Sequence, residues 1–296
     1  MKVKKIATIV GGQDGTIYQN FLFRFNHKGD ATVYQIDALR GLENKDEPAP
    51  VFARFHLDGT DWMNPHSNAV FFGNERVDPA DEFPVLYSNI YNNYEKCEKY
   101  EDRRQGTLVA YRITREGNVF SSKLIQIIKV GFADDDHYWR SAIEFKDFRP
   151  YGNFVFDAEK NHLYAYTMRD LTYRTRYFKF DMPAWNAGEP EPDHEDVRRV
   201  VLWEKDMLDF FDVEYHRYVQ GGCIHHGKVY EVEGFSGKNL NAPALRIIDL
   251  EKKRQEFFIL FEVLGLTSEA EWIDFDGEDC LYSDGKGNLV SLDFQL

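Results

Sequence analysis

Residues that could bind a ligand recur where short apolar segments of the chain begin. They are amides, acids, histidines and one tryptophan: Gln19, Asn20, His66, Asn68, Asn153, His216, Gln220, Glu269, Glu271 and Trp272. Side-chain amides offer both hydrogen-bond donors and acceptors, and aromatic rings can stack on sugar faces. This set predicts a binding site for a small polar ligand such as a saccharide. The same amides could instead have a structural role, satisfying backbone groups and water where strands meet.

A hydrolytic reaction on carbohydrate is the alternative function. Glycoside hydrolysis needs two carboxyl groups that face each other across the substrate. Glu269 and Glu271 lie at the start of the same segment, so the second acid would come from a loop, and Asp14 and Asp61 are candidates. The sequence therefore leaves open whether the chain is a non-catalytic binding module or a carbohydrate-active hydrolase or lyase.

Neither a cofactor nor a metal site is predicted. The segment Asp274–Asp279 resembles the beginning of a calcium loop, but Ser283 stands where the bidentate glutamate belongs. A tight turn between two strands explains the same residues. His225 and His226 fall at another expected turn, where spacing along the chain reveals no third ligand. The chain also has no Gly-x-Ser-x-Gly motif for nucleophilic catalysis.

The elements that must position these residues are short strands. Apolar and polar residues alternate with a period of two, and Gly, Asn or Asp occupies the intervening turns. The expected pattern is an innermost strand, a tight turn, a second strand with a tyrosine, and then a third and a fourth strand. Four antiparallel strands that recur every 45–50 residues or so are typical of a β-propeller blade.

Five such repeats begin near Asn20, Asn68, Asn153, Gly221 and Glu271, at spacings of 48, 85, 68 and 50 residues. The fold predicted is an all-β, five-bladed β-propeller forming a single domain over residues 1–296. A sixth blade hidden in the 85-residue interval is the alternative. We expect instead one blade with insertions at 94–105 and 131–150.

Several details of the blades follow from the same pattern. The first blade is expected to have 21–25 as its innermost strand, and the third to have 197–202 as its fourth. A short helix is expected over 204–211. The last repeat contains three strands, so the N-terminal strand at 5–10 is predicted to complete it and close the ring. Closure would remove the exposed strand edges that promote aggregation.

Charge and composition limit the partners and the compartment. The chain has 36 Lys and Arg against 50 Asp and Glu, a net charge of −14. Nucleic acid and anionic membrane surfaces repel such a chain, so the partner expected is a small polar ligand or another protein. No apolar run is long enough to cross a membrane. The start lacks the features of a signal peptide, and the odd count of three cysteines favours a reducing compartment. A cytoplasmic location is therefore expected, with export after signal removal as the alternative.

Three motifs resemble a group of uncharacterised bacterial β-propeller proteins of the gut Bacteroidales. They are Asp81–Tyr87 preceded by His66–Phe72, the segment Tyr18–Phe25, and the Gln-Gly-Gly hairpin at Gln220–Tyr230. The resemblance spans most of the chain and implies the propeller fold. It implies no activity, because the group has none established, and many of its members look exported.

Overall fold

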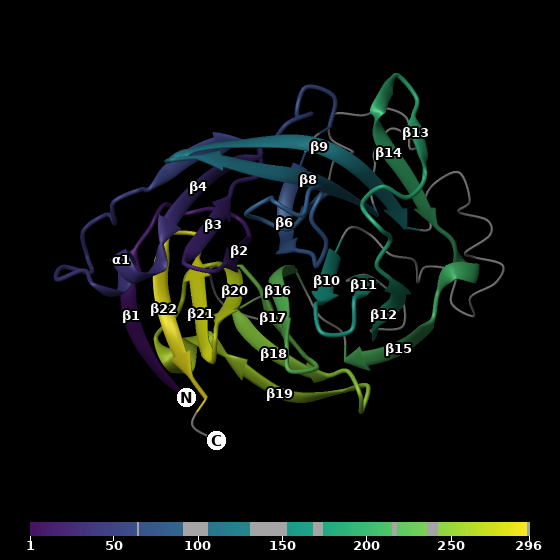
Figure 1. Cartoon of the computed structure of the whole chain (residues 1–296). Helices are drawn as coiled ribbons and strands as arrows, with labels where there is room; N and C mark the ends of the chain where they lie inside the picture. The colour runs from purple at the N-terminus through teal and green to yellow at the C-terminus, as the bar shows by residue number, and fades with distance from the viewer. Residues whose placement is uncertain are drawn as a thin grey trace.

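The β-branched and aromatic segments pair into five sheets that stand as blades around a common axis (Figure 1). The structure is a computed structural model, which describes residues 1–63, 65–90, 106–130, 153–167, 174–214, 218–235 and 242–294. The first four strands of each blade pair antiparallel, as expected when strands are joined as hairpins. The all-β, five-bladed propeller predicted from the sequence is confirmed.

Within the described residues, four of the blades have four strands each and blade 2 has six. From the axis outward, blade 1 contains β2 (Gly15–Tyr18), β3 (Phe21–Phe25), β4 (Asp30–Gln35) and β5 (Ala53–His56). Blade 2 contains β6 (Pro65–Phe72), β7 (Leu86–Ile90), β8 (Thr107–Glu116) and β9 (Val119–Val130), followed by β14 (His194–Leu202) and β13 (Glu189–Glu191). Blade 3 contains β10 (Asn153–Asp157), β11 (His162–Thr167), β12 (Arg174–Asp181) and β15 (Asp209–Glu214). Blade 4 contains β16 (Val219–His225), β17 (Lys228–Glu233), β18 (Ala244–Asp249) and β19 (Arg254–Leu260). Blade 5 contains β20 (Ala270–Asp276), β21 (Asp279–Asp284), β22 (Asn288–Asp293) and β1 (Lys2–Thr8).

Helices are short. Among the residues that the structure describes, they are α1 (Ile36–Arg40) and the 3-10 turns η4 (Glu204–Asp206) and η5 (Phe261–Leu264). No helix within the described part of the chain has the length and apolar character needed to cross a membrane.

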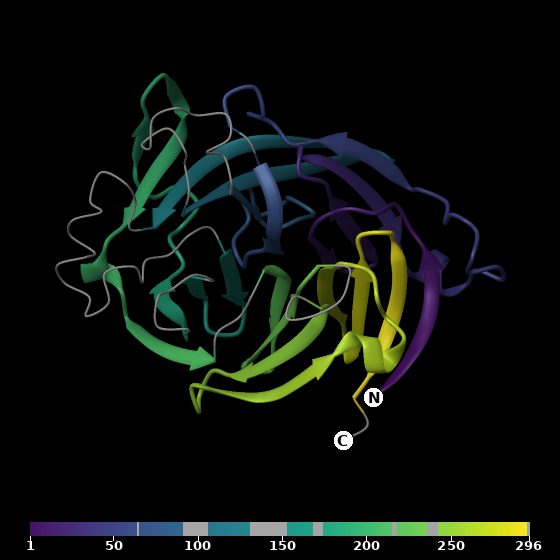
Figure 2. The same cartoon turned by 180° about the vertical axis from the view of Figure 1, so that it is seen from behind.

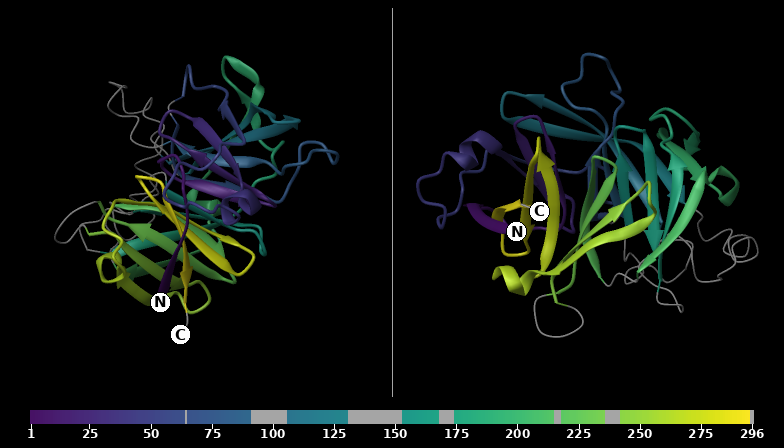
Figure 3. Two further views of the ribbon diagram at one scale, coloured as in Figure 1. Left: turned by 90° about the vertical axis from the view of Figure 1, so that its left-hand side faces the viewer. Right: turned by 90° about the horizontal axis from the view of Figure 1, so that it is seen from below.

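The first and last strands of the chain close the ring. β1 pairs antiparallel with β22, with Lys2 opposite Asp293 and Thr8 opposite Asn288. The N-terminus and the C-terminal strand therefore lie side by side, which Figures 2 and 3 show from behind and from the side. The predicted closure by an N-terminal strand is confirmed. Around the axis the innermost strands follow one another in the order β2, β6, β10, β16 and β20, and β20 again contacts β2.

The core lies between the blades. The described buried apolar side chains form five clusters, one in each interface between neighbouring blades. The interface of blades 1 and 2 is the most aromatic, with Phe23 packed edge-on against Phe72, Phe83 and Phe120 at centroid distances of 5.3–5.7 Å. Such edge-to-face pairs add to the free energy gained by burial. The abundant phenylalanine and tyrosine therefore join one blade to the next.

The 85-residue interval holds one blade, because β6 to β9 form a single sheet. The predicted insertions at 94–105 and 131–150 lie outside the described residues. The turn predicted at Asp276–Asp279 is confirmed between β20 and β21, where Gly277 has φ +61°.

The prediction for the first blade was wrong by one strand. The innermost strand is β2, not Phe21–Phe25, which forms the second strand β3. Both faces of β3 are buried: Phe21, Phe23 and Phe25 face blade 2, whereas Leu22 faces blade 5. β2 has only four residues, too few to show a clear alternation.

Two predictions for the third blade were also wrong. The segment predicted as its fourth strand is β14, which adds in parallel to β9 at the outer edge of blade 2. The true fourth strand is β15, whose Phe211 stacks on Tyr177 with ring centroids 5.1 Å apart. The predicted helix at 204–211 shrinks to the single turn η4, because Asp209–Phe211 pair with β12.

Candidate functional site

Three innermost strands meet at the carboxyl group of Asp14. This residue precedes β2, and its Oδ2 accepts a hydrogen bond of 2.8 Å from the backbone N–H of Val70 on β6. Its Oδ1 lies against Gly221 of β16, where an added Cβ would come within 2.9 Å of it. Blades 1, 2 and 4 therefore converge on one side chain at the end of the axis where the innermost strands begin. We call this end of the axis the upper end.

Arg24 and Glu271 complete a buried group of charged residues with Asp14. The three residues are 2%, 4% and 1% exposed, respectively. Arg24 lies on β3, and its guanidinium carbon is 5.3 Å from the ring centroid of Trp272, a cation–π contact between blades 1 and 5. Glu271 lies on β20, where Gly285 leaves space beside its carboxyl group. Charged groups this deeply buried must compensate one another.

Burial dominates the ionisation of all three groups. It raises the pKa of Glu271 to about 8, the negative charge of Glu269 adds to this rise, and Arg24 opposes it. Burial also raises the pKa of Asp14 well above its usual range, against hydrogen bonds from Val70 and Gly15. Burial lowers the pKa of Arg24, against the charges of Asp14 and Glu271. The carboxyl group of Glu271 therefore holds its proton at neutral pH.

Several buried polar atoms at this end of the axis have no hydrogen-bond partner among the described residues. They are Asp14 Oδ1, Arg24 Nε, Nη1 and Nη2, Glu271 Oε2, Asn153 Nδ2 and Trp272 Nε1. Buried polar atoms in folded proteins nearly always have a partner, and one without a partner costs about 1–3 kcal/mol. A set containing both donors and acceptors is therefore suited to a polar ligand.

Most of the residues predicted as a site lie at the upper end. Asn153 begins β10 and Asn68 is the fourth residue of β6, and both side chains are buried. Gln220 donates a 2.9 Å hydrogen bond to Glu269. Asn68 is held by Asn89, whose Oδ1 accepts from the backbone N–H groups of Asn68 and Ala69 at 3.1 Å. The backbone N–H groups of Asn68 and Ala69 are thus satisfied by an amide of β7 that was not among the predicted site residues.

The remaining predicted residues differ in their placement. Burial lowers the pKa of His66 to about 4, so its imidazole is neutral at the start of β6. Trp272 is fully buried between blades 5 and 1. Gln19 and Asn20 form the turn between β2 and β3, at the opposite end of the innermost strand, which corrects their predicted place. His216 lies outside the described residues.

Arg24 was missed, although it is central to the upper end. In the sequence it interrupts the apolar run Phe21–Phe25, where an alternating strand would place it on a solvated face. The one available signal is that both neighbours of Arg24 are phenylalanine and the whole run is otherwise apolar.

An axial cavity of about 270 Å³ lies further along the innermost strands. All five innermost strands contribute to its wall, which includes Gly15, Thr16 and Asp274. Asp274 accepts 2.8 Å hydrogen bonds from the backbone N–H groups of Ile17 and Phe275, and burial raises its pKa to about 6. None of the predicted site residues lines this cavity. Its volume is below the range of about 300–1,000 Å³ usual for drug-sized ligands.

A second cavity of about 450 Å³ lies away from the axis, against β17, β18 and β19. Tyr230, Phe257 and Phe294 are among the residues of its wall, with Lys228 and Glu256. The last two pair with each other at 2.6 Å. Lys228 and Glu256 therefore compensate each other's charge within the protein.

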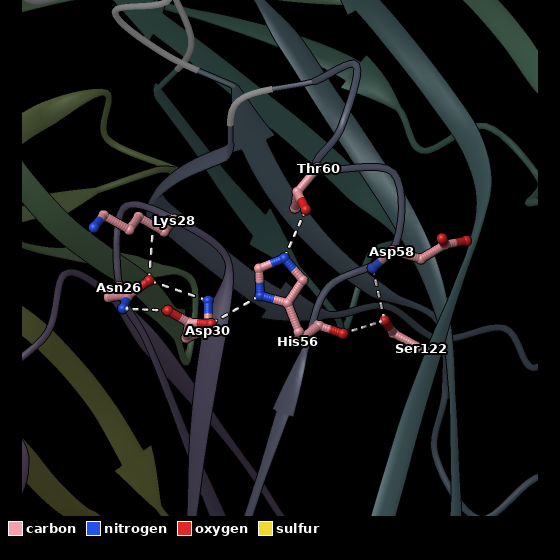
Figure 4. A network of polar contacts seen from close by, with 7 residues as sticks. All are labelled: Asn26, Lys28, Asp30, His56, Asp58, Thr60 and Ser122. Atoms are coloured by element: carbon pink, nitrogen blue, oxygen red, sulfur yellow. Dashed lines mark hydrogen bonds and ion pairs between the residues drawn. The ribbon is translucent and has the colours of Figure 1, made fainter.

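A surface network between blades 1 and 2 has the order of a hydrolytic triad (Figure 4). His56 contacts Asp30 Oδ1 through Nδ1 at 2.8 Å and Thr60 Oγ1 through Nε2 at 2.6 Å. An acid, an imidazole and a hydroxyl in this order can activate a nucleophile. In this network the imidazole and the acid are about half exposed, and neither residue lines either cavity described above. We interpret the network as structural.

Ser122 links this network to blade 2, and its loss should weaken the blade interface. Ser122 Oγ accepts from the backbone N–H of Asp58 and donates to the carbonyl of His56, both at 2.9 Å. We expect Ser122→Ala to lower the free energy of unfolding by about 1 kcal/mol, because two backbone groups lose their partner. Urea unfolding measures the change. Ser121→Ala, at the exposed neighbouring position, should change stability little, and equal effects of the two would contradict the structural role.

Comparison with known proteins finds similar structures but no relative by sequence. No family model matches the chain, and no curated protein matches it by sequence. The structure is similar to glutaminyl cyclase of Myxococcus xanthus, with 10% identity and a TM-score of 0.49 over 99% of this chain and 96% of that one. It is also similar to the computationally designed Ika8 protein, with 9% identity and a TM-score of 0.37 over 97% and 99% of the two chains. Likeness at these levels carries no argument about activity.

Proposed function

We propose that the protein is a binding module that takes a small polar ligand, of the saccharide or polyol class, at the upper end of its axis. The observation that supports this most is the set of buried polar atoms without partners around Asp14, Arg24 and Glu271, among the residues that the structure describes. A ligand that hydrogen-bonds to them would recover the free energy that burial costs these groups.

The chemistry of these atoms favours hydroxyl groups. Arg24 and Asn153 offer donors, and Asp14 Oδ1 is an acceptor. Glu271, which holds its proton at neutral pH, can donate as well as accept. A hydroxyl group also does both, so one ligand with several hydroxyls can satisfy donors and acceptors on different blades. In the other form of the proposal, a protein partner docks at the upper end of the axis. Such a partner would not hydrogen-bond to these buried atoms.

Hydrolysis of carbohydrate is the second candidate. A pKa of about 8 for Glu271 suits a general acid that works near neutral pH. The second carboxyl group would then have to be ionised, as a nucleophile or a base. Asp14, which interacts electrostatically with Glu271, is one candidate, but its pKa is also raised. This ranks hydrolysis below binding, and turnover that Glu271→Gln left unchanged would exclude Glu271 as the acid.

The proposal is tested by thermal unfolding with a panel of monosaccharides and polyols, comparing wild type with Asn153→Leu. A ligand at 100 times its Kd adds about 2.7 kcal/mol of stability, enough to raise the Tm by about 5 °C or more. Asn153→Leu has a similar size but lacks the unpaired donor. It should therefore retain the stability of the free protein and lose at least about tenfold in affinity, the equivalent of one hydrogen bond.

The control is the same replacement at an exposed site, Asn44→Leu, which should bind like wild type. The proposal fails if no compound stabilises the wild-type protein. It also fails if Asn153→Leu responds as strongly as wild type does.

A further inference from the structure

Three tight turns from three consecutive blades meet at the lower face, the end of the axis opposite Asp14. They are the β10–β11 turn with Glu159, the β16–β17 turn with His225 and His226, and the β20–β21 turn with Glu278. His226 Nε2 lies 3.1 Å from Glu278 Oε1, and His225 Nε2 lies 3.6 Å from Glu278 Oε2. Two imidazoles of one blade therefore face a carboxylate of the next.

The arrangement of these atoms fits a metal ion better than an ion pair alone. One ligand atom from each of His225, His226 and Glu278 lies within 4.8 Å of the others. Two ligands bound tetrahedrally to Zn²⁺ at about 2.0–2.1 Å lie about 3.3 Å apart, between the two spacings observed. The 3.6 Å separation is too long for a hydrogen bond, and His225 Nε2 has no hydrogen-bond partner among the described residues.

The surrounding structure holds both imidazoles in place. His225 stacks on Phe275 with ring centroids 3.9 Å apart and planes at 6° to each other. His226 occupies the turn itself, with φ +47°, next to Gly227 at φ +69°. On the far side of the ring, His226 Nδ1 lies 3.4 Å from Glu159 Oε1. A carboxylate behind a ligating histidine fixes the ring and strengthens the ligand.

We propose that His225, His226 and Glu278 bind a divalent transition-metal ion of the Zn²⁺ class, with Glu159 orienting His226. Two imidazole nitrogens and one carboxylate oxygen are a donor set that Zn²⁺ accepts. Three protein ligands leave a fourth position for water, which the exposure of His226 and Glu278, 62% and 84%, allows. The ion would join blades 4 and 5 at the lower face, independently of the ligand proposed for the upper end.

The test is a titration of tag-free protein with Co²⁺, followed by its visible absorption, and then displacement by Zn²⁺. Wild type should take up one equivalent with the strong absorption of a four-coordinate ion. His226→Gln and Glu278→Gln should lose the signal at the same concentration, because each removes one of three ligands. Glu159→Gln should retain it with affinity lower by about 10–100-fold.

The control is His56→Gln, which removes a half-exposed histidine that pairs with Asp30, away from the proposed site. This variant should bind Co²⁺ like wild type. The ligand turns are exposed, so circular dichroism should show all variants folded. The proposal is overturned if wild type gives no absorption at stoichiometric Co²⁺. It is equally overturned if His226→Gln and Glu278→Gln give the wild-type spectrum, which would place the ion elsewhere and leave an ion pair at these turns.

Discussion

The protein is expected to lose about 2 kcal/mol of stability as the pH rises from about 6.5 to about 8, and Glu271→Gln is expected to remove most of that loss. In the folded protein the pKa of Glu271 is about 8, against 4.5 for an ordinary glutamate. Between these values the folded state keeps a proton that the unfolded state has released. Rising pH therefore favours unfolding, by up to about 1.4 kcal/mol per pH unit for one proton.

The effect of Glu271 begins near pH 4.5, but below about pH 6.5 the titrations of Asp274 and His66 overlap it. The pKa of Asp274 is raised from 3.8 to about 6, so Asp274 also makes the folded protein less stable as the pH rises, but only up to about pH 6. The pKa of His66 is lowered from 6.5 to about 4, so its contribution has the opposite sign and grows between pH 4 and 6.5. The two contributions offset each other at low pH, and neither changes above about 6.5.

Urea unfolding at four pH values, about 5.5, 6.5, 7.5 and 8.5, measures this dependence. Glu262→Gln, at an exposed glutamate of the turn η5, is the matched control and should follow the wild-type curve. If the free energy of unfolding of Glu271→Gln still falls with rising pH, the remaining slope would be assigned to Asp14 and His226, whose pKa values are also raised. If the free energy of unfolding of the wild-type protein stayed constant or rose between about pH 6.5 and 8, Glu271 would not be held protonated.

Gly221→Ala should destabilise the fold by about 3 kcal/mol or more. A Cβ at this position would come within 2.5 Å of the carbonyl oxygen of Glu271 and 2.9 Å of Asp14 Oδ1. The first neighbour is backbone and cannot rotate away, so β16 and β20 must separate at the upper end. Overpacking of a filled interior typically costs about 1–3 kcal/mol, and at this position the contact also disturbs a buried charge.

The control for Gly221 is Gly117→Ala, measured by the same urea unfolding. Gly117 has φ +63° and nothing within 4 Å of an added Cβ, so alanine there should cost about 1 kcal/mol of backbone strain. A cost at Gly221 no larger than at Gly117 would contradict the close approach of three blades at Asp14.

The sequence predicts the blades well because each is built from local hairpins. Alternation and turn residues mark strands such as β16 and β17, and the missing fourth strand of the last repeat points to closure by the N-terminus. Sheet membership of the outer strands is not local. Val197–Leu202 alternates like any fourth strand, and only its parallel pairing with β9 shows that it extends blade 2.

The site was predictable where it depends on strand starts, and hidden where it depends on contacts between blades. Asn68, Asn153 and Glu271 were found because they lie in the first half of innermost strands. Arg24 was not, because its burial against Trp272 of blade 5 arises only when the ring closes. Likewise, Glu278 is more than fifty positions from His225 and His226 in the sequence, and only the packing of blades 4 and 5 brings it to them.

The central claim, that buried polar atoms at the upper end of the axis bind a small hydroxylated ligand, is tested most directly by a crystal structure of protein soaked in mixed monosaccharides. The claim predicts ligand density with hydroxyl oxygens about 2.7–3.2 Å from Arg24 nitrogens and Asn153 Nδ2. Density showing no ligand, with Arg24 bonded directly to Asp14 and Glu271, would contradict it.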